Sequence, residues 1–95
     1  MPKKKEIKYY VIGGQYEKYN YGGTPTLLGA KRLATKNEEY WDNWQGWHKP
    51  AIYRAEDCVL RNGCFGEDYY PKLDCYPFLV WDNAYNAWFE REYVC

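Results

Sequence analysis

The residues best suited to chemistry gather in the run EYWDNWQGWHKP, residues 39–50, which holds Trp41, Trp44, Trp47 and the chain's single histidine, His48. A histidine can act as a general base or ligate a metal, whereas tryptophans build cores or anchor a partner. Base catalysis needs a nucleophile beside the histidine, and the chain has no serine and no motif around a cysteine that would supply one. The run therefore favours binding over catalysis.

Four cysteines are the other candidate ligands: Cys58, Cys64, Cys75 and Cys95. Structural zinc sites usually place ligands in pairs about two to four residues apart, whereas five, ten and nineteen residues separate these cysteines. We therefore predict reduced thiols, with no metal and no cofactor. A zinc site that combines three cysteines with His48 or with the fourth cysteine stays open as an alternative.

The segment GGQYEKYNYGG lacks the glycine spacing of the known phosphate-binding loops. It carries Tyr16, Lys18, Tyr19 and Tyr21 between pairs of glycines. Tyrosines in such a setting can stack on bases or anchor on a protein, because they offer a large contact area for little lost rotamer freedom. The equally weighted alternative is that two of the three tyrosines cover the open face of a sheet.

Composition limits the possible partners. The 13 basic and 13 acidic residues balance, so net charge does not favour nucleic acid or an anionic membrane. Residues 1–36 carry eight Lys/Arg against two acids, and residues 37–95 carry five against eleven, which predicts a charge dipole. Twelve tyrosines and five tryptophans exceed what one small core can bury, so we expect some of them on the surface as binding anchors.

The clearest expected element is a helix that begins near residue 24. Thr24 is a good N-cap, Pro25 suits the first helical position, and Gly46 is a plausible stop. Spacings of three and four place one apolar stripe on this helix, made of Leu27, Ala30, Leu33, Ala34, Trp41 and Trp44. We therefore expect Trp41 and Trp44 in the core and Trp47 outside it. Asn37 lies on the same stripe and could instead mark a break between two helices.

The remaining segments predict strands. The stretches 6–12 and 15–21 fit a strand and a short second strand, and residues 50–60 fit a strand that leads into a polar stretch. Residues 61–77 are expected to form a loop, and residues 78–92 a hairpin with its turn near Asp82. The prediction is a single α+β domain, 1–95, with residues 1–5 frayed. It is a small, mainly antiparallel sheet with one long helix, or a broken one, packed on one face.

The sequence contains no run of about 18 apolar residues that would span a membrane. The basic start MPKKK is followed by a short apolar run that glycines interrupt, which does not fit a signal peptide. We therefore expect a cytoplasmic protein.

About half of the chain, from KYYVIGG to AEDC, resembles small proteins of bacteriophages and mobile elements of gut Firmicutes. The similar parts are GGTPTLLGAKRLA, YWDNWQGW and IYRAEDC. That group has no established activity. The resemblance implies a bacterial cytoplasm and a host protein as partner, because small phage proteins of this kind often inhibit host factors such as CRISPR effectors and other defences.

These observations predict a non-enzymatic protein-binding module that uses an aromatic face to modulate or inhibit a host protein. The expected contact residues are Tyr16, Lys18, Tyr19, Tyr21, Trp47 and His48. One alternative is a module for single-stranded nucleic acid that stacks bases on the tyrosines beside the lysine. A further alternative is a small metal-dependent enzyme. The oligomeric state is open, and a homodimer is one option.

Overall fold

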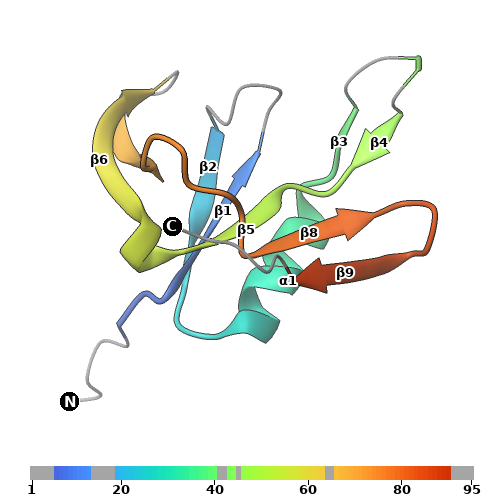
Figure 1. Cartoon of the computed structure of the whole chain (residues 1–95), viewed down its shortest axis with the longest axis horizontal. Coiled ribbons are helices and arrows are strands. Elements are labelled where there is room, and N and C mark those ends of the chain that lie inside the picture. Colours follow the sequence, from blue (N-terminus) through green and yellow to red (C-terminus); the bar gives the residue numbers. More distant parts are fainter. Residues whose placement is uncertain (1–5, 14–18, 41–42, 45, 64–65, 91–95) are drawn as a thin grey trace.

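The chain folds into an antiparallel sheet with one helix packed against it (Figure 1). The computed structural model describes residues 6–13, 19–40, 43–44, 46–63 and 66–90. In chain order the elements are β1 (Tyr9–Gly13), β2 (Tyr19–Thr24), α1 (Leu27–Lys36), β3 (Glu39–Tyr40), β4 (Trp47–His48), β5 (Ala51–Arg54), the 3-10 helix η1 (Ala55–Asp57), β6 (Cys58–Gly63), β7 (Gly66–Pro71), β8 (Leu79–Asp82) and β9 (Ala87–Glu90). The predicted α+β class is confirmed.

The main sheet has five strands in the order β2-β1-β5-β8-β9, and every neighbouring pair is antiparallel. Two smaller ladders, β3–β4 and β6–β7, are hairpins attached to this sheet. The strands expected at the start of the chain and after Pro50 are therefore present. The second strand extends beyond the predicted residue 21, because β2 continues through Gly22 and Gly23 and pairs with β1 there. Residues 15–18 of the predicted strand lie outside the described residues.

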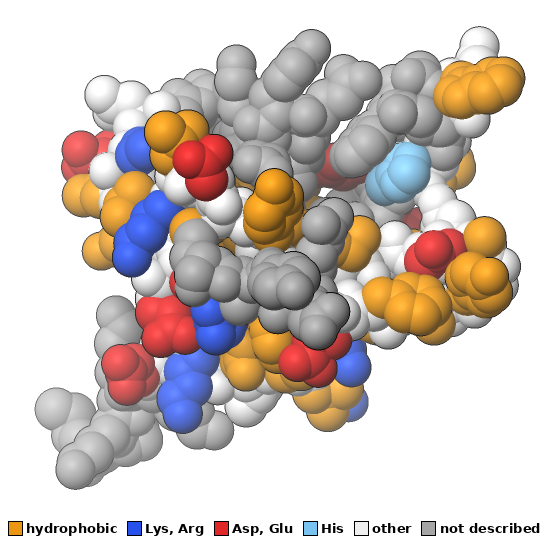
Figure 2. Space-filling model, in the orientation of Figure 1, with side chains coloured by type: hydrophobic (Ala, Val, Ile, Leu, Met, Phe, Trp, Pro, Cys, Tyr) orange, Lys and Arg blue, Asp and Glu red, His pale blue; other side chains and the backbone are white. Residues whose placement is uncertain are grey.

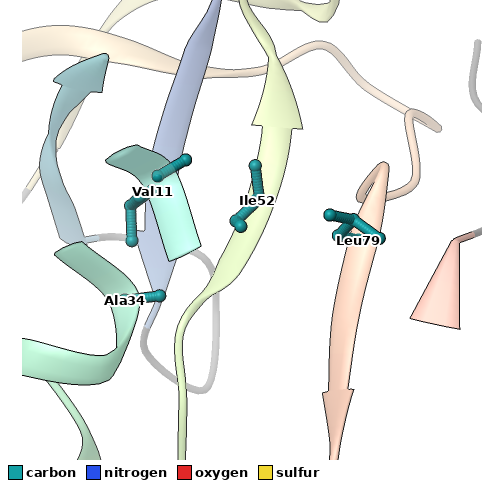
Figure 3. Packing of buried hydrophobic residues seen from close by; sticks show 5 residues of the cluster. Val11, Ala34, Ile52 and Leu79 are labelled. Carbon is teal, nitrogen blue, oxygen red and sulfur yellow. The ribbon is translucent and has the colours of Figure 1, made fainter. Parts of the chain in front are cut away.

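Alternation along the central strands divides the core into two layers. Val11 and Ile52 point toward α1 and pack with Ala30, Ala34 and Leu79 (Figure 3). The neighbouring residues Ile12 and Tyr53 point to the opposite face, because successive side chains of a strand alternate. There they meet Cys58 and Tyr70 of the β6–β7 hairpin, so helix and hairpin cover the two faces of the sheet.

The helix begins two residues later than predicted. Thr26, not Thr24, is the N-cap, and its side-chain oxygen accepts a hydrogen bond from Gly29 N at 3.1 Å. Thr24 is unable to cap the helix because it belongs to β2, where it lies opposite Tyr9 of β1. Pro25 falls in the connection between strand and helix. Sheet pairing therefore decided which of two equally suitable threonines became the cap.

The helix also ends earlier than the apolar stripe suggests. Asn37 is its C-cap. The Asn37 backbone N–H donates a hydrogen bond to Ala34 O at 3.1 Å, and its side-chain amide donates one to Leu33 O at 2.9 Å. The expectation of one long helix is therefore wrong, and β3 follows α1 where the alternative placed the start of a second helix. The prediction that Trp44 lies in the core is wrong, since 94% of its surface is exposed. Trp41 lies outside the described residues.

No helix in the described part of the chain is both long and apolar enough to cross a bilayer.

The segment 61–77, predicted to be a loop, contains most of a hairpin. Strands β6 and β7 pair from Cys58 opposite Pro71 to Gly63 opposite Gly66. Glycine suits position 66 because its φ of 103° is a conformation that other residues rarely adopt. The polar composition hid this hairpin, because most of its residues face solvent and only its base contributes to the core. Residues 72–77 are irregular, as expected.

The predicted carboxy-terminal hairpin is present as β8–β9. β8 and β9 pair from Leu79 opposite Glu90 to Asp82 opposite Ala87. Asp82 stabilises the turn because its carboxylate accepts hydrogen bonds from the backbone N–H groups of Ala84 at 2.8 Å and Tyr85 at 3.3 Å. Asn86, with φ of 50°, completes the turn.

Truncation of a buried residue between the sheet and α1 should cost more stability than truncation of an exposed residue of α1. We expect Ile52→Ala to lower the free energy of unfolding by about 2–5 kcal/mol, because Ile52 is fully buried between sheet and helix. Leu28→Ala, on the exposed side of the same helix, should change it by no more than about 0.5 kcal/mol. Urea unfolding followed by circular dichroism measures both values. Equal losses would contradict the assigned core.

Candidate functional site

The β3–β4 hairpin displays aromatic side chains on the side that faces away from the sheet. Tyr40 lies opposite Trp47 in the ladder, and their rings meet edge to face with centroids 5.5 Å apart. The Tyr40 hydroxyl donates a hydrogen bond to the side-chain oxygen of Asn43 in the turn. Gly46 closes the turn with φ of 72°, which glycine adopts without strain. These contacts hold the rings in place before any partner arrives.

Tyr40, Trp44 and Trp47 are all exposed and together form what we call the aromatic hairpin face. Trp44 is 94% exposed and Trp47 is 60% exposed. Figure 2 shows hydrophobic side chains at the end of the molecule that carries β3 and β4. Tryptophan is the residue type most enriched among binding hot spots, so exposure of this degree indicates a contact surface.

The opposite side of the hairpin is docked on the main sheet through a carboxylate. Glu39 accepts a hydrogen bond from the Tyr21 hydroxyl of β2. The Glu39 carboxylate also occupies the space beside Gly13 of β1, where a side chain would collide with it and would approach Pro50 Cβ within 2.8 Å. Burial, together with the bond to Glu39, raises the pKa of Tyr21 well above its ordinary value. The hydroxyl therefore stays protonated and keeps donating.

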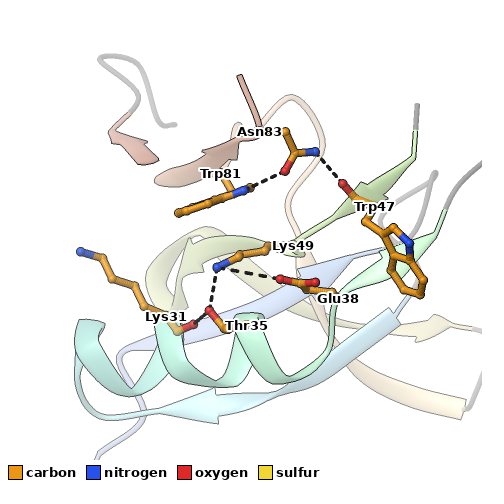
Figure 4. Close-up of polar contacts among 7 residues, drawn as sticks. All are labelled: Lys31, Thr35, Glu38, Trp47, Lys49, Trp81 and Asn83. Atoms are coloured by element: carbon orange, nitrogen blue, oxygen red, sulfur yellow. Dashed lines mark hydrogen bonds and ion pairs between the residues drawn. The ribbon is translucent and has the colours of Figure 1, made fainter. Parts of the chain in front are cut away.

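A second set of contacts ties the hairpin to β8–β9 (Figure 4). The indole N–H of Trp81 donates to the Asn83 side-chain oxygen at 2.8 Å, and the Asn83 amide donates to the backbone carbonyl of Trp47 at 2.5 Å. Asn83 thus couples the two hairpins. Because one of its bonds ends on Trp47 itself, the backbone that carries this indole is held directly.

Lys49 fills the space between Trp81 and α1. Its ammonium lies 3.8 Å from the centroid of the Trp81 ring and donates to Thr35 Oγ1 at 3.0 Å. Glu38 lies 4.0 Å away, and the Lys49 side chain is only 14% exposed. Cation and ring attract one another more strongly in such a sheltered position than in water. Lys49 therefore connects Trp81 to α1, and its sheltered ammonium is poorly placed to contact a ligand.

The structure distributes the predicted contact residues over different positions. Trp47 is exposed, as predicted, and Tyr19 is exposed at the start of β2. Tyr21 is half-buried in the support of the hairpin, and His48 lies half-buried opposite Glu39 on the side away from the aromatic rings. Tyr16 and Lys18 lie outside the described residues.

Sequence reasoning missed the exposed positions of Tyr40 and Trp44. A signal was present, because Asn43 and Gly46 are turn-forming residues on either side of Trp44. The helical spacing of Trp44 from Leu33 and Trp41 was given more weight than this turn chemistry. Spacing alone did not reveal that the helix had already ended.

Arg54, Glu56 and Asp57 form a group of ion pairs at the end of β5. Asp57 is buried and accepts a hydrogen bond from Arg54 Nε at 2.9 Å, while Glu56 pairs with Arg54 Nη1 at 3.1 Å. A cleft of about 310 Å³ beside this pair is lined by residues 6–9 and 54–56, whose charges balance. Within the described ranges, no three His, Cys, Asp or Glu side chains converge as metal ligands do.

The prediction that all four cysteines are reduced thiols is wrong. Cys75 is disulfide-bonded, whereas Cys58 is a buried free thiol. The sequence argument assigned thiols from the expected compartment and had no geometry with which to bring two cysteines together. The positions of Cys64 and Cys95 lie outside the described residues.

The Cys58 thiol should be unreactive, and it should make stability depend on pH. Burial, reinforced by the neighbouring Asp57, raises the pKa of Cys58 from 9.0 to about 12. The unfolded chain loses this proton first, so the contribution of Cys58 to stability is complete below about pH 9 and decreases as pH rises toward about 12. We expect urea unfolding to show this decrease and Cys58→Ala to show a shallower one. Alkylation of native Cys58 at about pH 8 as fast as in urea would contradict the assignment.

No family model, curated protein or solved structure matches the chain.

Proposed function

We propose that the chain is a non-enzymatic protein-binding module that holds its partner through the aromatic hairpin face. The observation that carries this proposal is the 94% exposed Trp44 on a hairpin that is fastened on two sides. An exposed indole leaves apolar area in contact with water, and this area is recovered only when a partner covers it.

Preorganisation supports the proposal. A flexible loop loses conformational freedom when it binds, whereas this hairpin is already held by Glu39 beneath it and by Asn83 beside it. Two of the exposed rings also contact one another, because Tyr40 packs against Trp47. Such a group of rings fits the apolar pocket of a protein, where a central aromatic anchor contributes most of the affinity.

Single-stranded nucleic acid is the less favoured alternative. Tyr21, one of its proposed stacking residues, is half-buried and bonded to Glu39. Lys49, the cation that follows the hairpin, is sheltered under Trp81. Nucleic-acid affinity depends mainly on cations that reach phosphates, and the described part of the hairpin offers none that is exposed. The further alternative, a metal-dependent enzyme, finds no set of three ligands in the described residues.

The resemblance to phage and mobile-element proteins suggests where to search for the partner. We propose a protein of the bacterial host, bound in its cytoplasm and inhibited or modulated there, with CRISPR effectors and other defence factors among the candidates. The Cys75 disulfide argues against this location, because such bonds persist mainly in oxidising compartments. Both the partner and the compartment are proposals that rest on the resemblance.

Removal of the Trp44 ring should weaken partner binding without unfolding the chain. We expect Trp44→Ala to reduce affinity by about 2 kcal/mol or more, which is roughly 30-fold, and to change stability by less than about 1 kcal/mol. Immobilised wild-type and variant chains would be compared on one bacterial lysate by quantitative mass spectrometry. Affinity would then be measured with the purified protein that Trp44→Ala fails to retain.

Leu73→Ala is the matched control, because Leu73 is also an exposed large apolar residue but lies in the irregular segment after β7. It should retain the same protein as wild type. If Trp44→Ala and Trp47→Ala retain every protein that wild type retains, the aromatic hairpin face is not the binding surface.

The nucleic-acid alternative makes an opposite prediction about salt. We expect no binding of a fluorescent single-stranded oligonucleotide tighter than about 10 μM at physiological salt. Fluorescence anisotropy across a salt series measures this. Sub-micromolar binding that weakens steeply with salt would favour nucleic acid over a protein partner.

A further inference from the structure

The disulfide partner of Cys75 follows from the positions of the other cysteines. Cys75 is buried and disulfide-bonded, and it lies in the connection between β7 and β8. Cys58 is a free thiol, although it too is buried. The sequence holds four cysteines, so the partner of Cys75 within the chain is either Cys64 or Cys95.

The β6–β7 ladder keeps Cys64 away from Cys75. At the base of the ladder Lys72 N donates to Asp57 O at 2.8 Å, and Cys75 N donates to Lys72 O at 3.1 Å. The second bond closes a turn, which keeps the Cα atoms of Lys72 and Cys75 within about 7 Å of one another. From Asp57 to Gly63 the hairpin extends roughly 19 Å, at about 3.2 Å per residue. Even a turn folded back along the hairpin therefore leaves Cys75 about 12 Å from Gly63.

This separation excludes a bond between Cys64 and Cys75. Consecutive Cα atoms are about 3.8 Å apart, so Cys64, which follows Gly63, stays at least about 8 Å from Cys75. A disulfide requires Cα atoms no more than about 7 Å apart.

Cys95 is within reach of Cys75. Glu90 pairs with Leu79 at the open end of the β8–β9 hairpin, so their Cα atoms are about 5 Å apart. Leu79 follows Cys75 by four residues, which adds at most about 14 Å. The chain from Glu90 to Cys95 extends up to about 17 Å and a disulfide spans about 6 Å more, which together exceed the gap.

We infer that Cys75 is bonded to Cys95, and that this bond clamps the open end of the β8–β9 hairpin. Nineteen residues separate the two cysteines, and these residues include both strands of the hairpin. The bond forms when the two thiols give two electrons and two protons to a disulfide oxidant such as oxidised glutathione, which leaves as two glutathione thiols. A dithiol reductant returns two electrons and two protons and itself becomes a disulfide.

The β8–β9 hairpin benefits from a clamp because little of its backbone is paired with the rest of the sheet. In the described part of the chain β8 joins β5 at one residue pair, Ile52 opposite Leu79, and β9 pairs with β8 alone (Figure 1). The hairpin also carries Asn83, whose amide bonds to the backbone carbonyl of Trp47. The stability of this support therefore depends on the oxidation state of the chain. The pairing itself rests on distances and does not depend on the proposed function.

Peptide mapping of the full chain identifies the pairing directly. Cleavage after lysine and arginine separates the four cysteines onto peptides 55–61, 62–72, 73–91 and 92–95. The chain would be oxidised in glutathione buffer, alkylated in urea, and digested without reduction. We expect mass spectrometry to find 73–91 linked to 92–95, and both peptides released by a dithiol. Peptide 73–91 in any other form, whether linked elsewhere, joined to glutathione or alkylated, would overturn the pairing.

Thermal melting tests the clamp. We expect Cys95→Ala to lower the melting temperature of the oxidised chain by roughly 10 °C or more, because a cross-link that closes a loop of this length removes many conformations of the unfolded chain. Cys64→Ala is the matched control. It makes the same change at a cysteine that the bond does not use, and should melt within roughly 3 °C of wild type.

Reduction provides the second comparison. A dithiol should lower the melting temperature of wild type and of Cys64→Ala by about as much as Cys95→Ala does in the oxidised chain, and it should leave Cys95→Ala unchanged. If oxidised Cys95→Ala melts with wild type, or if Cys64→Ala loses as much as Cys95→Ala, the proposed clamp is wrong.

Discussion

The Glu39 carboxylate, packed into the space beside Gly13 and bonded to the Tyr21 hydroxyl, is the contact on which the exposed surface depends. Glycine at position 13 lets the β3–β4 hairpin approach the sheet more closely than any larger residue would. Tyr21 satisfies the carboxylate at that depth, which avoids the cost of burying a charge without a hydrogen bond. With one side of the hairpin so engaged, Tyr40 and Trp47 necessarily point outward.

A second constraint connects the hairpin to the rest of the fold. Asn83 is positioned by Trp81, and Trp81 rests on Lys49, which in turn is bonded to Thr35 of α1. These contacts link α1, the β3–β4 hairpin and the β8–β9 hairpin through side chains that bond to one another. Such linked contacts make the orientation of the Trp47 backbone depend on the helix and on β8–β9 as well as on the hairpin itself.

The distribution of aromatic residues follows from the size of the core. Two small layers on either side of β1 and β5 accommodate mainly aliphatic residues, with Tyr53 and Tyr70 as the large members. Of the other rings, some are partly buried against these layers and others are exposed, including Tyr40, Trp44 and Trp47 on β3–β4 and Tyr85 and Phe89 on β8–β9. On β3–β4 the exposed Tyr40 and Trp47 rings contact one another, and Trp44 is the most exposed large apolar residue among those described.

Local patterns in the sequence determined the central strands β1 and β5, and they determined the β8–β9 hairpin, whose turn contains Asp82. The β1 and β5 segments are rich in β-branched and aromatic residues, and Asp82 stabilises its turn through contacts within three residues. The surplus of aromatic residues also indicated that some of them had to be exposed. The position of Trp47 outside the core was among these predictions.

Tertiary structure decided the features that depend on distant residues. The choice of Thr26 over Thr24 as the cap depends on the pairing of β2 with β1, and the early end of α1 allows Glu39 to reach Tyr21. Ile12 and Tyr53 stabilise the base of the β6–β7 hairpin by packing against Cys58 and Tyr70. Ile12 and Tyr70 are 58 positions apart in the chain. Trp44 continued a helical spacing, yet it became exposed because spacing records only local geometry, whereas burial depends on which surfaces the folded chain brings together.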